Sequence, residues 1–351
     1  MFYQCPSCKK VWQYPIKKCL DCLTDLKELD SEKAKVIGVS KNSITSLTHP
    51  KVPYFILVLE DENKNRWIQK SVKEYQIGED FVLEPSKDKE AVVIWRVKYD
   101  VLEAVKKAIE LLGGLKVEAV DKIMILPTLV LPKHPYFATN TNPGFLEATI
   151  RYLLSKGADV NNIKVAAQSF DEIPIEASAQ KSQLLAVCQR YQIAPLDLAK
   201  SNFIKKEKDG LSFEISEEVF NSDLIINLPI LKLDEKSGVR GAAENSLKFL
   251  KKESCLALQY LASQQELIEK VQSLLPGYLN LADSIAIQKK GGYTTFLSLT
   301  LASFNPFNLD RVFAEIAMID NMPDHLKKIP VESIPVIGRQ IKEVQYEFER
   351  W

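Results

Sequence analysis

The sequence of 351 residues lacks an excess of charge, has little histidine and contains no long apolar segment. Lysine plus arginine and aspartate plus glutamate both number 46, so the charge balance gives no global reason to expect binding to nucleic acid or to a membrane. The longest apolar runs, such as residues 122–132, are far shorter than the ~20 residues that cross a bilayer. Three histidines argue against a histidine-rich catalytic metal centre, and the Gly-x-Ser-x-Gly motif of a hydrolase elbow is absent.

The N-terminus also lacks the charged-then-apolar pattern of a secretory signal. We therefore expect a cytoplasmic protein whose thiols stay reduced unless they hold a metal. The length is too great for one typical domain. Changes of pattern along the chain predict three units: a zinc ribbon over 1–29, an OB-like β-barrel over 30–98 and an α/β domain over 99–351.

Four of the six cysteines form two Cys-x-x-Cys pairs, Cys5 with Cys8 and Cys19 with Cys22. Each pair can place two thiolates on one tight turn, and the ten residues between the pairs suit a hairpin that brings them together. Four thiolates at about 2.3 Å complete a tetrahedron around Zn²⁺, so we predict one structural zinc per chain. Iron in a rubredoxin-type site uses the same ligands, and unliganded reduced cysteines are the other alternative. A thioredoxin-like redox pair would need one such motif ahead of a helix.

Five short runs rich in β-branched and aromatic residues follow, separated by polar turns. Five strands are too few for a sandwich and suit a small Greek-key barrel of the OB type, with 91–98 as the fifth strand. Aromatic residues of this region could stack nucleic-acid bases, but such residues more often fill the barrel. They are Tyr54, Phe55, Trp67 and Trp95.

The ribbon YQCPSC…KKCLDC, followed by KVIGVSKNSIT…PYFILVLEDENKNRWIQKSV…IGEDFVLEP, resembles the family catalogued as domain of unknown function 35. In that family the ribbon and barrel accompany thiolases, hydroxymethylglutaryl-CoA synthases and related acyl-CoA enzymes. The resemblance covers residues 1–98. It implies a module that recruits substrate or serves as a bridge to an acyl-CoA-metabolising partner.

From residue 99 onward, helical patterns alternate with apolar strands. Predicted helices are 99–115, 142–159 and 178–193, and predicted strands are 122–131, 164–169 and 223–231. This alternation predicts a mainly parallel sheet with helices on both faces. Ligands of such sheets bind beyond the carboxyl ends of the strands, so the segments that follow the strands are the candidates for a site.

Three of those segments, 126–144, 228–250 and 301–319, are rich in polar and charged residues. Cationic side chains and helix N-terminal amides suit a carboxylate or a phosphate. We therefore expect a small anionic ligand, and its candidate binding residues are Lys232, Gly238, Arg240, Gly241 and Asn245. No motif identifies catalytic residues, and the candidates are Lys232, Asp234 and Asp310.

The same segments allow a second divalent metal in the α/β domain, held by Asp234, Glu235 or Asp310. Simpler roles compete with these. Charged runs are more often solvated loops, and Gly238-x-x-Gly241 lacks both the Walker lysine and the full dinucleotide fingerprint. An aspartate near a helix N-terminus can simply complement the helix dipole. The two remaining cysteines are expected in the core, and they are Cys188 and Cys255.

Residues 99–351 are similar to the family catalogued as domain of unknown function 362. The segments that carry the similarity are LPTLV, TNPGFLEATIRYLLSKGA, DLIINLPILKLDEKSGVRGAAENSLKFL, LADSI, ASFNPFNLDRVFAEIA and VIGRQIKEV. The resemblance implies an α/β domain, in some members joined to ferredoxin-type iron–sulfur modules, with no generally established activity. The positions that match are Lys232, Gly238, Gly241, Asn245, Asp283, Ser303, Pro306 and Asp310.

The chain departs from that family at three places. LPT stands at 126–128 where Lys-Pro-Asn is usual, Lys-Leu-Asp at 232–234 where Lys-Thr-His is usual, and Glu244 where a lysine is frequent. These losses are compatible with a site that binds a ligand without turning it over. With Cys188 and Cys255 as its only cysteines, this region cannot hold a four-cysteine cluster of its own.

Two functions of different class follow from these patterns. In the first, the α/β domain binds or acts on a small carboxylate or acyl thioester, and the ribbon and barrel recruit substrate or partner. In the second, the protein is a non-catalytic bridging subunit of an acyl-CoA enzyme complex. Nucleic-acid binding through the ribbon and barrel is a weaker alternative because residues 1–98 lack a dense basic stripe. The sequence does not decide whether the protein is an enzyme.

Overall fold

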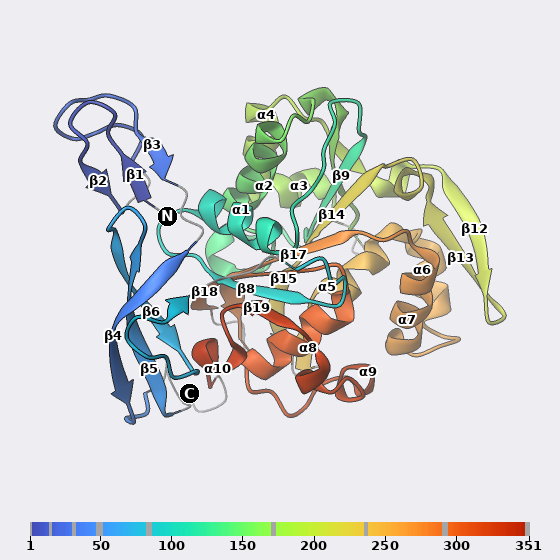
Figure 1. Cartoon of the computed structure of the whole chain (residues 1–351). Helices are drawn as coiled ribbons and strands as arrows, with labels where there is room; N and C mark the ends of the chain where they lie inside the picture. The colour runs from blue at the N-terminus through green and yellow to red at the C-terminus, as the bar shows by residue number, and fades with distance from the viewer. Residues whose placement is uncertain are drawn as a thin grey trace.

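The computed structural model describes residues 2–13, 16–29, 33–46, 52–81, 86–169, 173–234, 238–289 and 294–347. Two small antiparallel sheets come first in the chain, and a large mixed sheet flanked by helices follows. Figure 1 shows the small sheets side by side at one end of the large sheet and the hairpin β12–β13 at the other end. Glu235, one of the residues expected to bind a metal, lies outside the described residues.

The N-terminal sheet has three short strands in the order β2-β1-β3. They are β1 (Phe2–Gln4), β2 (Val11–Trp12) and β3 (Lys27–Leu29). The two cysteine turns lie between these strands. With so little apolar surface buried, a unit of this size depends on a metal or on its neighbours for stability.

The second sheet is antiparallel with the order β6-β5-β4-β7. Its strands are β4 (Ala34–Asn42), β5 (Tyr54–Asp61), β6 (Arg66–Ser71) and β7 (Asp80–Phe81). Alternate residues of β4 and β5 form its core, including Val36, Leu57 and Leu59. Asp61 makes the tight turn before β6 by accepting hydrogen bonds from the amides of Asn63 and Asn65.

The strand predicted to be the fifth of the barrel belongs instead to the large sheet. This strand, β8 (Val92–Arg96), pairs with β18 (Thr294–Ser303) and with β19 (Val336–Gly338). Val93 packs into one core cluster while Val92 and Ile94 pack into another on the opposite face. A run that is apolar on both sides needs cover on both faces, which a central strand of a layered sheet receives. The described residues therefore do not confirm a closed OB barrel.

The large sheet is mixed, and most of its strand pairings are parallel. Its order is β11-β10-β9-β14-β17-β18-β8-β19, with β15 paired to β16 and β17. Pairing is parallel from β11 to β17 and between β8 and β19, whereas β17–β18, β18–β8 and β15–β16 are antiparallel. The remaining strands are β9 (Ile123–Pro127), β10 (Ile163–Ala167), β11 (Pro195–Asp197), β14 (Leu224–Leu228), β15 (Ile230–Asp234), β16 (Gly238–Arg240) and β17 (Leu279–Gln288).

Helices cover both faces of this sheet, as the sequence predicts (Figure 1). Side chains of strand β9 alternate between the two faces. Ile123 and Ile125 contribute to the core under α1, α2 and α4. Met124 and Leu126 contribute to the core under α6 and α7. The helices are α1 (Val101–Leu111), α2 (Pro143–Ser155), α3 (Ile175–Lys181), α4 (Leu184–Arg190), α5 (Ala242–Asn245), α6 (Lys252–Leu258), α7 (Gln264–Leu274), α8 (Pro306–Ile316), α9 (Asp324–Lys327) and α10 (Ile341–Val344).

The helix expected over 178–193 is divided into α3 and α4, because Gln183 between them has a left-handed backbone with φ of 65°. The stretch 206–210 includes the tip of a hairpin formed by β12 (Phe203–Lys208) and β13 (Leu211–Ser216). Across the described ranges, no helix is both long enough and apolar enough to span a bilayer.

Candidate functional site

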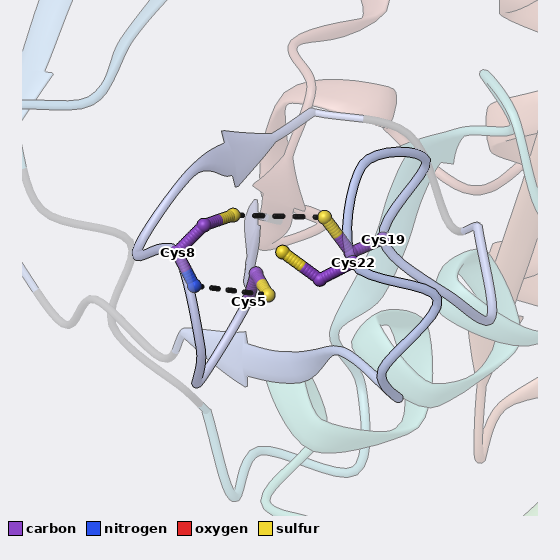
Figure 2. A group of neighbouring side chains, drawn as sticks. All are labelled: Cys5, Cys8, Cys19 and Cys22. Atoms are coloured by element: carbon purple, nitrogen blue, oxygen red, sulfur yellow. Dashed lines mark hydrogen bonds between the residues drawn. The ribbon is translucent and has the colours of Figure 1, made fainter.

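The four N-terminal cysteines converge on one point. Their sulfur atoms all lie within 4.8 Å of one another, and Figure 2 shows the four side chains directed toward a common centre. The Sγ atoms of Cys8 and Cys19 are 3.7 Å apart. A regular tetrahedron with metal–sulfur bonds of about 2.3 Å has sulfur atoms about 3.8 Å apart. The arrangement therefore fits a closed tetrathiolate site.

Two equivalent turns bring these sulfur atoms together. In the first turn Lys9 donates its amide to the Cys5 carbonyl at 3.0 Å, and in the second Leu23 donates to the Cys19 carbonyl at 2.9 Å. Each of these donors directly follows the second cysteine of its pair and has a left-handed backbone, with φ of 63° for Lys9 and 56° for Leu23. Repetition of one turn geometry at both pairs is what a single shared metal requires.

The chemistry of the donors agrees with metal binding. Hydrogen bonds from the Thr24 hydroxyl and from backbone amides lower the pKa of the Cys5 thiol, whereas hydrogen bonds with the neighbouring thiols and burial raise the pKa of Cys22. A thiolate is the form that ligates a metal. Four cysteines with no open position make the site structural, and the donor set suits zinc or iron equally. Within the described residues, this is the one group of three or more metal-ligating side chains at binding distance.

A second candidate site is a polar pocket in the α/β domain. It encloses about 480 Å³ beyond the carboxyl ends of β9 and β14, where the parallel part of the sheet ends. Its walls come from the loop after β9, the hairpin β15–β16 and helix α5 with the turn that follows it. Five of the predicted site residues line this pocket: Lys232, Asp234, Arg240, Gly241 and Asn245.

Lys232 provides the most distinctive group in the pocket. The hairpin register places it opposite Arg240, and its Nζ donates a hydrogen bond to the main-chain carbonyl of Thr139. Burial lowers the pKa of Lys232 to about 8, with Arg240 and Lys248 acting in the same direction and Glu244 opposing them. The Lys232 ammonium is thus hydrogen-bonded to an uncharged acceptor and is only partly solvated.

Charges at the rim are partly balanced. Arg240 lies 3.3 Å from Asp234, measured from Nε to Oδ2, and 3.7 Å from Glu244, measured from Nη1 to Oε1. Glu244 also accepts a hydrogen bond from the side chain of Gln264 at 3.0 Å. Lys248 is a further cation on the wall. Three cations and two carboxylates leave the pocket with a net positive charge.

Asn245 lies at the pocket, but its amide is used inside the protein. Its Nδ2 donates to the Asn227 side chain at 2.7 Å and to the Leu126 carbonyl at 3.3 Å, and its Oδ1 accepts from the Thr128 hydroxyl at 3.0 Å. Asn227 in turn donates to the Asn280 side chain at 2.8 Å. The chain of amides joins α5 to β9, β14 and β17. Asn245 therefore shapes the pocket and has little capacity left to bind a ligand.

Asp310 and Gly238 also have structural roles. The carboxylate of Asp310 accepts hydrogen bonds from the amides of Ala242 and Ala243 at 2.7 and 2.9 Å, and so caps the first turn of α5. Burial raises the pKa of Asp310 to about 7, against the opposing effect of the two amides. Gly238 has φ of 71° and lies against the Asn321 carbonyl, which leaves no room for a side chain. Among the described residues, neither Asp234 nor Asp310 belongs to a group of three or more side chains that could hold a metal ion.

Other residues that the sequence singled out are placed away from the pocket or in the core. Cys188 and Cys255 are buried in the core, as expected, and burial raises the pKa of each thiol to about 11. Asp283 accepts the amide of Asn142 at 2.7 Å and so fixes the chain at the start of α2. His134, one of the three histidines of the sequence, is exposed and caps a short turn by accepting the amide of Tyr136.

Sequence reasoning missed part of the pocket wall. Lys248, Gln259 and Gln288 line it, although none was singled out as a candidate. Lys248 follows Asn245 by three residues, so the helical spacing of that stretch could have placed it on the same side. Gln288 reaches the pocket only because β17 pairs with β15, a contact that sequence spacing does not reveal.

Comparison with known proteins gives a family match and several matches to solved structures, two of which are described below. No curated protein matches the sequence. The lactate racemase apoprotein from Thermoanaerobacterium thermosaccharolyticum is 12% identical, with a TM-score of 0.39, over 65% of this chain and 57% of that one. A Thermotoga maritima protein is 9% identical, with a TM-score of 0.34, over 55% of this chain and 52% of that one. The chain thus spans little more than half the length of either structure.

The sequence match covers residues 123–315 and includes the strands and loops that form the polar pocket. The resemblance of residues 1–98 to domain of unknown function 35 stays a prediction. The match extends over more than half of the 351 residues, and the protein therefore belongs to the family described as domain of unknown function 362 (DUF362).

Proposed function

We propose that this protein binds a small carboxylate or acyl-thioester anion in the pocket around Lys232, with the cysteine ribbon as a structural zinc module. The observation that carries the proposal is the Lys232 ammonium, which lies in a polar pocket and donates a hydrogen bond to the neutral carbonyl of Thr139. Burial destabilises the charged form of Lys232, and an anion that enters the pocket would stabilise it.

The position of the pocket supports the same function. Ligands of open α/β sheets bind beyond the carboxyl ends of the strands, and β9 and β14 end at this pocket. Lys232 stands across the hairpin from Arg240, so two cations can reach one ligand from neighbouring strands. A volume of about 480 Å³ suits a small organic acid or the acyl end of a thioester.

Lys232 also suits proton transfer, because a pKa of about 8 allows both protonation states near neutral pH. Asp234, which is 3.3 Å from Arg240, is the carboxylate best placed to assist it. Asp310 is less suited because both of its oxygens accept backbone amides. Binding is the primary function proposed, and catalysis would require a further group from the substrate or a partner.

A recruiting role for the N-terminal module completes the proposal. The second cysteine turn exposes two large apolar side chains, Leu20 at 67% and Leu23 at 72%. Apolar groups exposed next to a rigid metal site suit contact with another protein. The partner expected from the family resemblance is an acyl-CoA-metabolising enzyme, and the bridging function would use this same surface.

Isothermal titration calorimetry with succinate and with acetyl-CoA tests the pocket. We expect at least one of them to bind the wild-type protein and to lose about tenfold or more in affinity with Lys232→Met. Lys122→Met is the matched control, because Lys122 is exposed and lies outside the pocket. Binding that Lys232→Met leaves unchanged, or no binding of either probe, would exclude the proposed site.

A further inference from the structure

A second pocket lies where the ribbon, the four-stranded sheet and the α/β domain meet. It encloses about 170 Å³ and shares no lining residue with the Lys232 pocket. Phe2 reaches it from the ribbon, Trp67 and Phe81 from the four-stranded sheet, and Trp95 from β8. All three units of the chain therefore contribute to one small cavity.

One side of this junction pocket is aromatic. The rings of Phe2 and Trp67 lie 5.9 Å apart at an angle of 58°, so the ribbon and the four-stranded sheet meet through them. Trp95 belongs to a different sheet yet lines the same cavity. Walls of this kind favour a flat apolar group, which can stack on or contact the ring edges.

Cationic side chains line the same cavity. Arg96, Lys98, Lys107 and Arg339 line the cavity, against the carboxylates of Asp100 and Glu103. Asp100 is already engaged as the cap of α1 through the amide of Leu102 at 3.0 Å.

Like Lys107, both Arg96 and Lys98 lack a side-chain hydrogen bond or ion pair in the portions of the chain that the structure covers. Burial lowers the pKa of both side chains. Glu343 opposes this effect at Arg96 and Glu103 opposes it at Lys98, so each cation has a carboxylate nearby but no direct ion pair.

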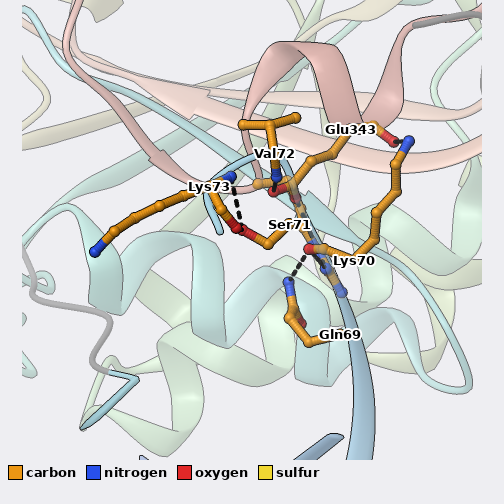
Figure 3. Close-up of polar contacts among 7 residues, drawn as sticks. Gln69, Lys70, Ser71, Val72, Lys73 and Glu343 are labelled. Carbon is orange, nitrogen blue, oxygen red and sulfur yellow. Dashed lines mark hydrogen bonds and ion pairs between the residues drawn. The ribbon is translucent and has the colours of Figure 1, made fainter. Parts of the chain in front are cut away.

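Arg339 is the most buried of these cations, with 7% of its surface exposed. Its Nη1 donates to the Lys70 carbonyl at 3.4 Å, and its Nε has no hydrogen-bond partner among the described residues. The nearest carboxylate, Glu343, is 3.9 Å from Nη1 and accepts the amide of Val72 instead (Figure 3). Lys70 donates to the Glu343 carbonyl rather than to its carboxylate. The Glu343 carboxylate thus lies near several cations but does not pair closely with any of them.

We propose that the junction pocket binds a small aromatic anion, with its ring against Trp67 and Trp95 and its charged group at Arg96 and Arg339. An apolar cavity of about 150 Å³ is enough to hold benzene, so about 170 Å³ admits one ring and leaves the charged group at the cationic side chains. The ligand would contact all three units and so favour their packed arrangement. The inference goes beyond the proposed function because it concerns a different site and ligand.

Phenyl phosphate is the probe that combines both features, and calorimetry on the zinc-loaded full-length protein tests it. We expect phenyl phosphate to bind. Inorganic phosphate should bind with an affinity at least about tenfold lower, because it lacks the ring. Arg96→Gln should weaken phenyl phosphate by about tenfold or more. Lys98→Gln should weaken it in the same direction, because it removes another cation from the cavity wall.

Two variants serve as controls. Arg66→Gln changes an exposed arginine that pairs with Glu60 outside the cavity, and Lys232→Met removes the cation of the other pocket. Both should leave phenyl phosphate affinity unchanged. The proposal is overturned if phenyl phosphate does not bind at millimolar concentration, if Arg96→Gln and Lys98→Gln bind it as the wild type does, or if Lys232→Met abolishes binding.

Discussion

The carboxylate of Asp310 lies directly against the Cα of Gly241, in the space that a side chain at position 241 would need. Its two oxygens accept the amides of Ala242 and Ala243, the first residues of α5. Because α5 forms one wall of the Lys232 pocket, the contact between Gly241 and Asp310 sets the position of that wall. The glycine and the aspartate of this segment thus form one structural unit.

Gly241→Ala should therefore destabilise the protein. The added methyl group would collide with the Asp310 carboxylate and with the Leu231 side chain, which is buried and cannot move freely. We expect a loss of about 1–3 kcal/mol in the free energy of unfolding, measured by denaturant titration. Gly277→Ala is the matched control, since a methyl group there meets nothing within 4 Å. Equal stability of the two variants would contradict this assignment.

Asp310→Asn should change how stability depends on pH. Burial raises the pKa of Asp310 from 3.8 to about 7, so the folded protein holds this proton more tightly than the unfolded chain does. The stability contributed by the protonated carboxyl is fully present below about pH 4 and is lost as the pH rises toward 7.

The unfolding free energy of the wild type minus that of Asp310→Asn should therefore decrease from pH 4 to 7, by at most ~1.4 kcal/mol per pH unit. Asp283 and Glu343 also have pKa values raised to about 6 by burial, but they are common to both proteins and cancel in the difference. A difference that does not vary with pH would show that Asp310 does not titrate in this range.

Cys8→Ser should remove the metal from the protein. The Cys8 sulfur lies 3.7 Å from that of Cys19, so its loss opens the tetrahedron. We expect about one metal ion per wild-type chain by elemental analysis and far less in the variant. Cys255→Ala, which changes a buried core cysteine, should keep the full content. Equal metal content in Cys8→Ser and the wild type would exclude the tetrathiolate site.

Much of the fold and the site could be predicted from local patterns. The cysteine spacing alone indicated one cluster, because two tight turns in a hairpin can hardly place four sulfur atoms elsewhere. Lys232, Asp234 and Arg240 were expected at a strand end, and the hairpin β15–β16 does bring them to one pocket. In both cases residues close in sequence determine the geometry.

The parts that could not be predicted depend on contacts between distant segments. Strand β8 looked like a barrel strand because its neighbours in sequence are strands of that sheet, yet its partners β18 and β19 lie more than 200 residues away. The role of Asp310 was equally hidden, since the amides it accepts belong to residues 242 and 243. Composition does not distinguish a ligand-binding carboxylate from one that caps a distant helix.

The most direct test of the account is the pKa of the Lys232 side chain, measured by NMR with and without succinate. Isotopic labelling of the lysine side chains gives one signal for each, and Lys232→Met identifies the signal of interest. The account predicts titration near 8 in the free protein and a shift to higher pH when succinate binds, because the anion stabilises the ammonium. Titration near the ordinary lysine value of about 10.4, with no response to succinate, would contradict it.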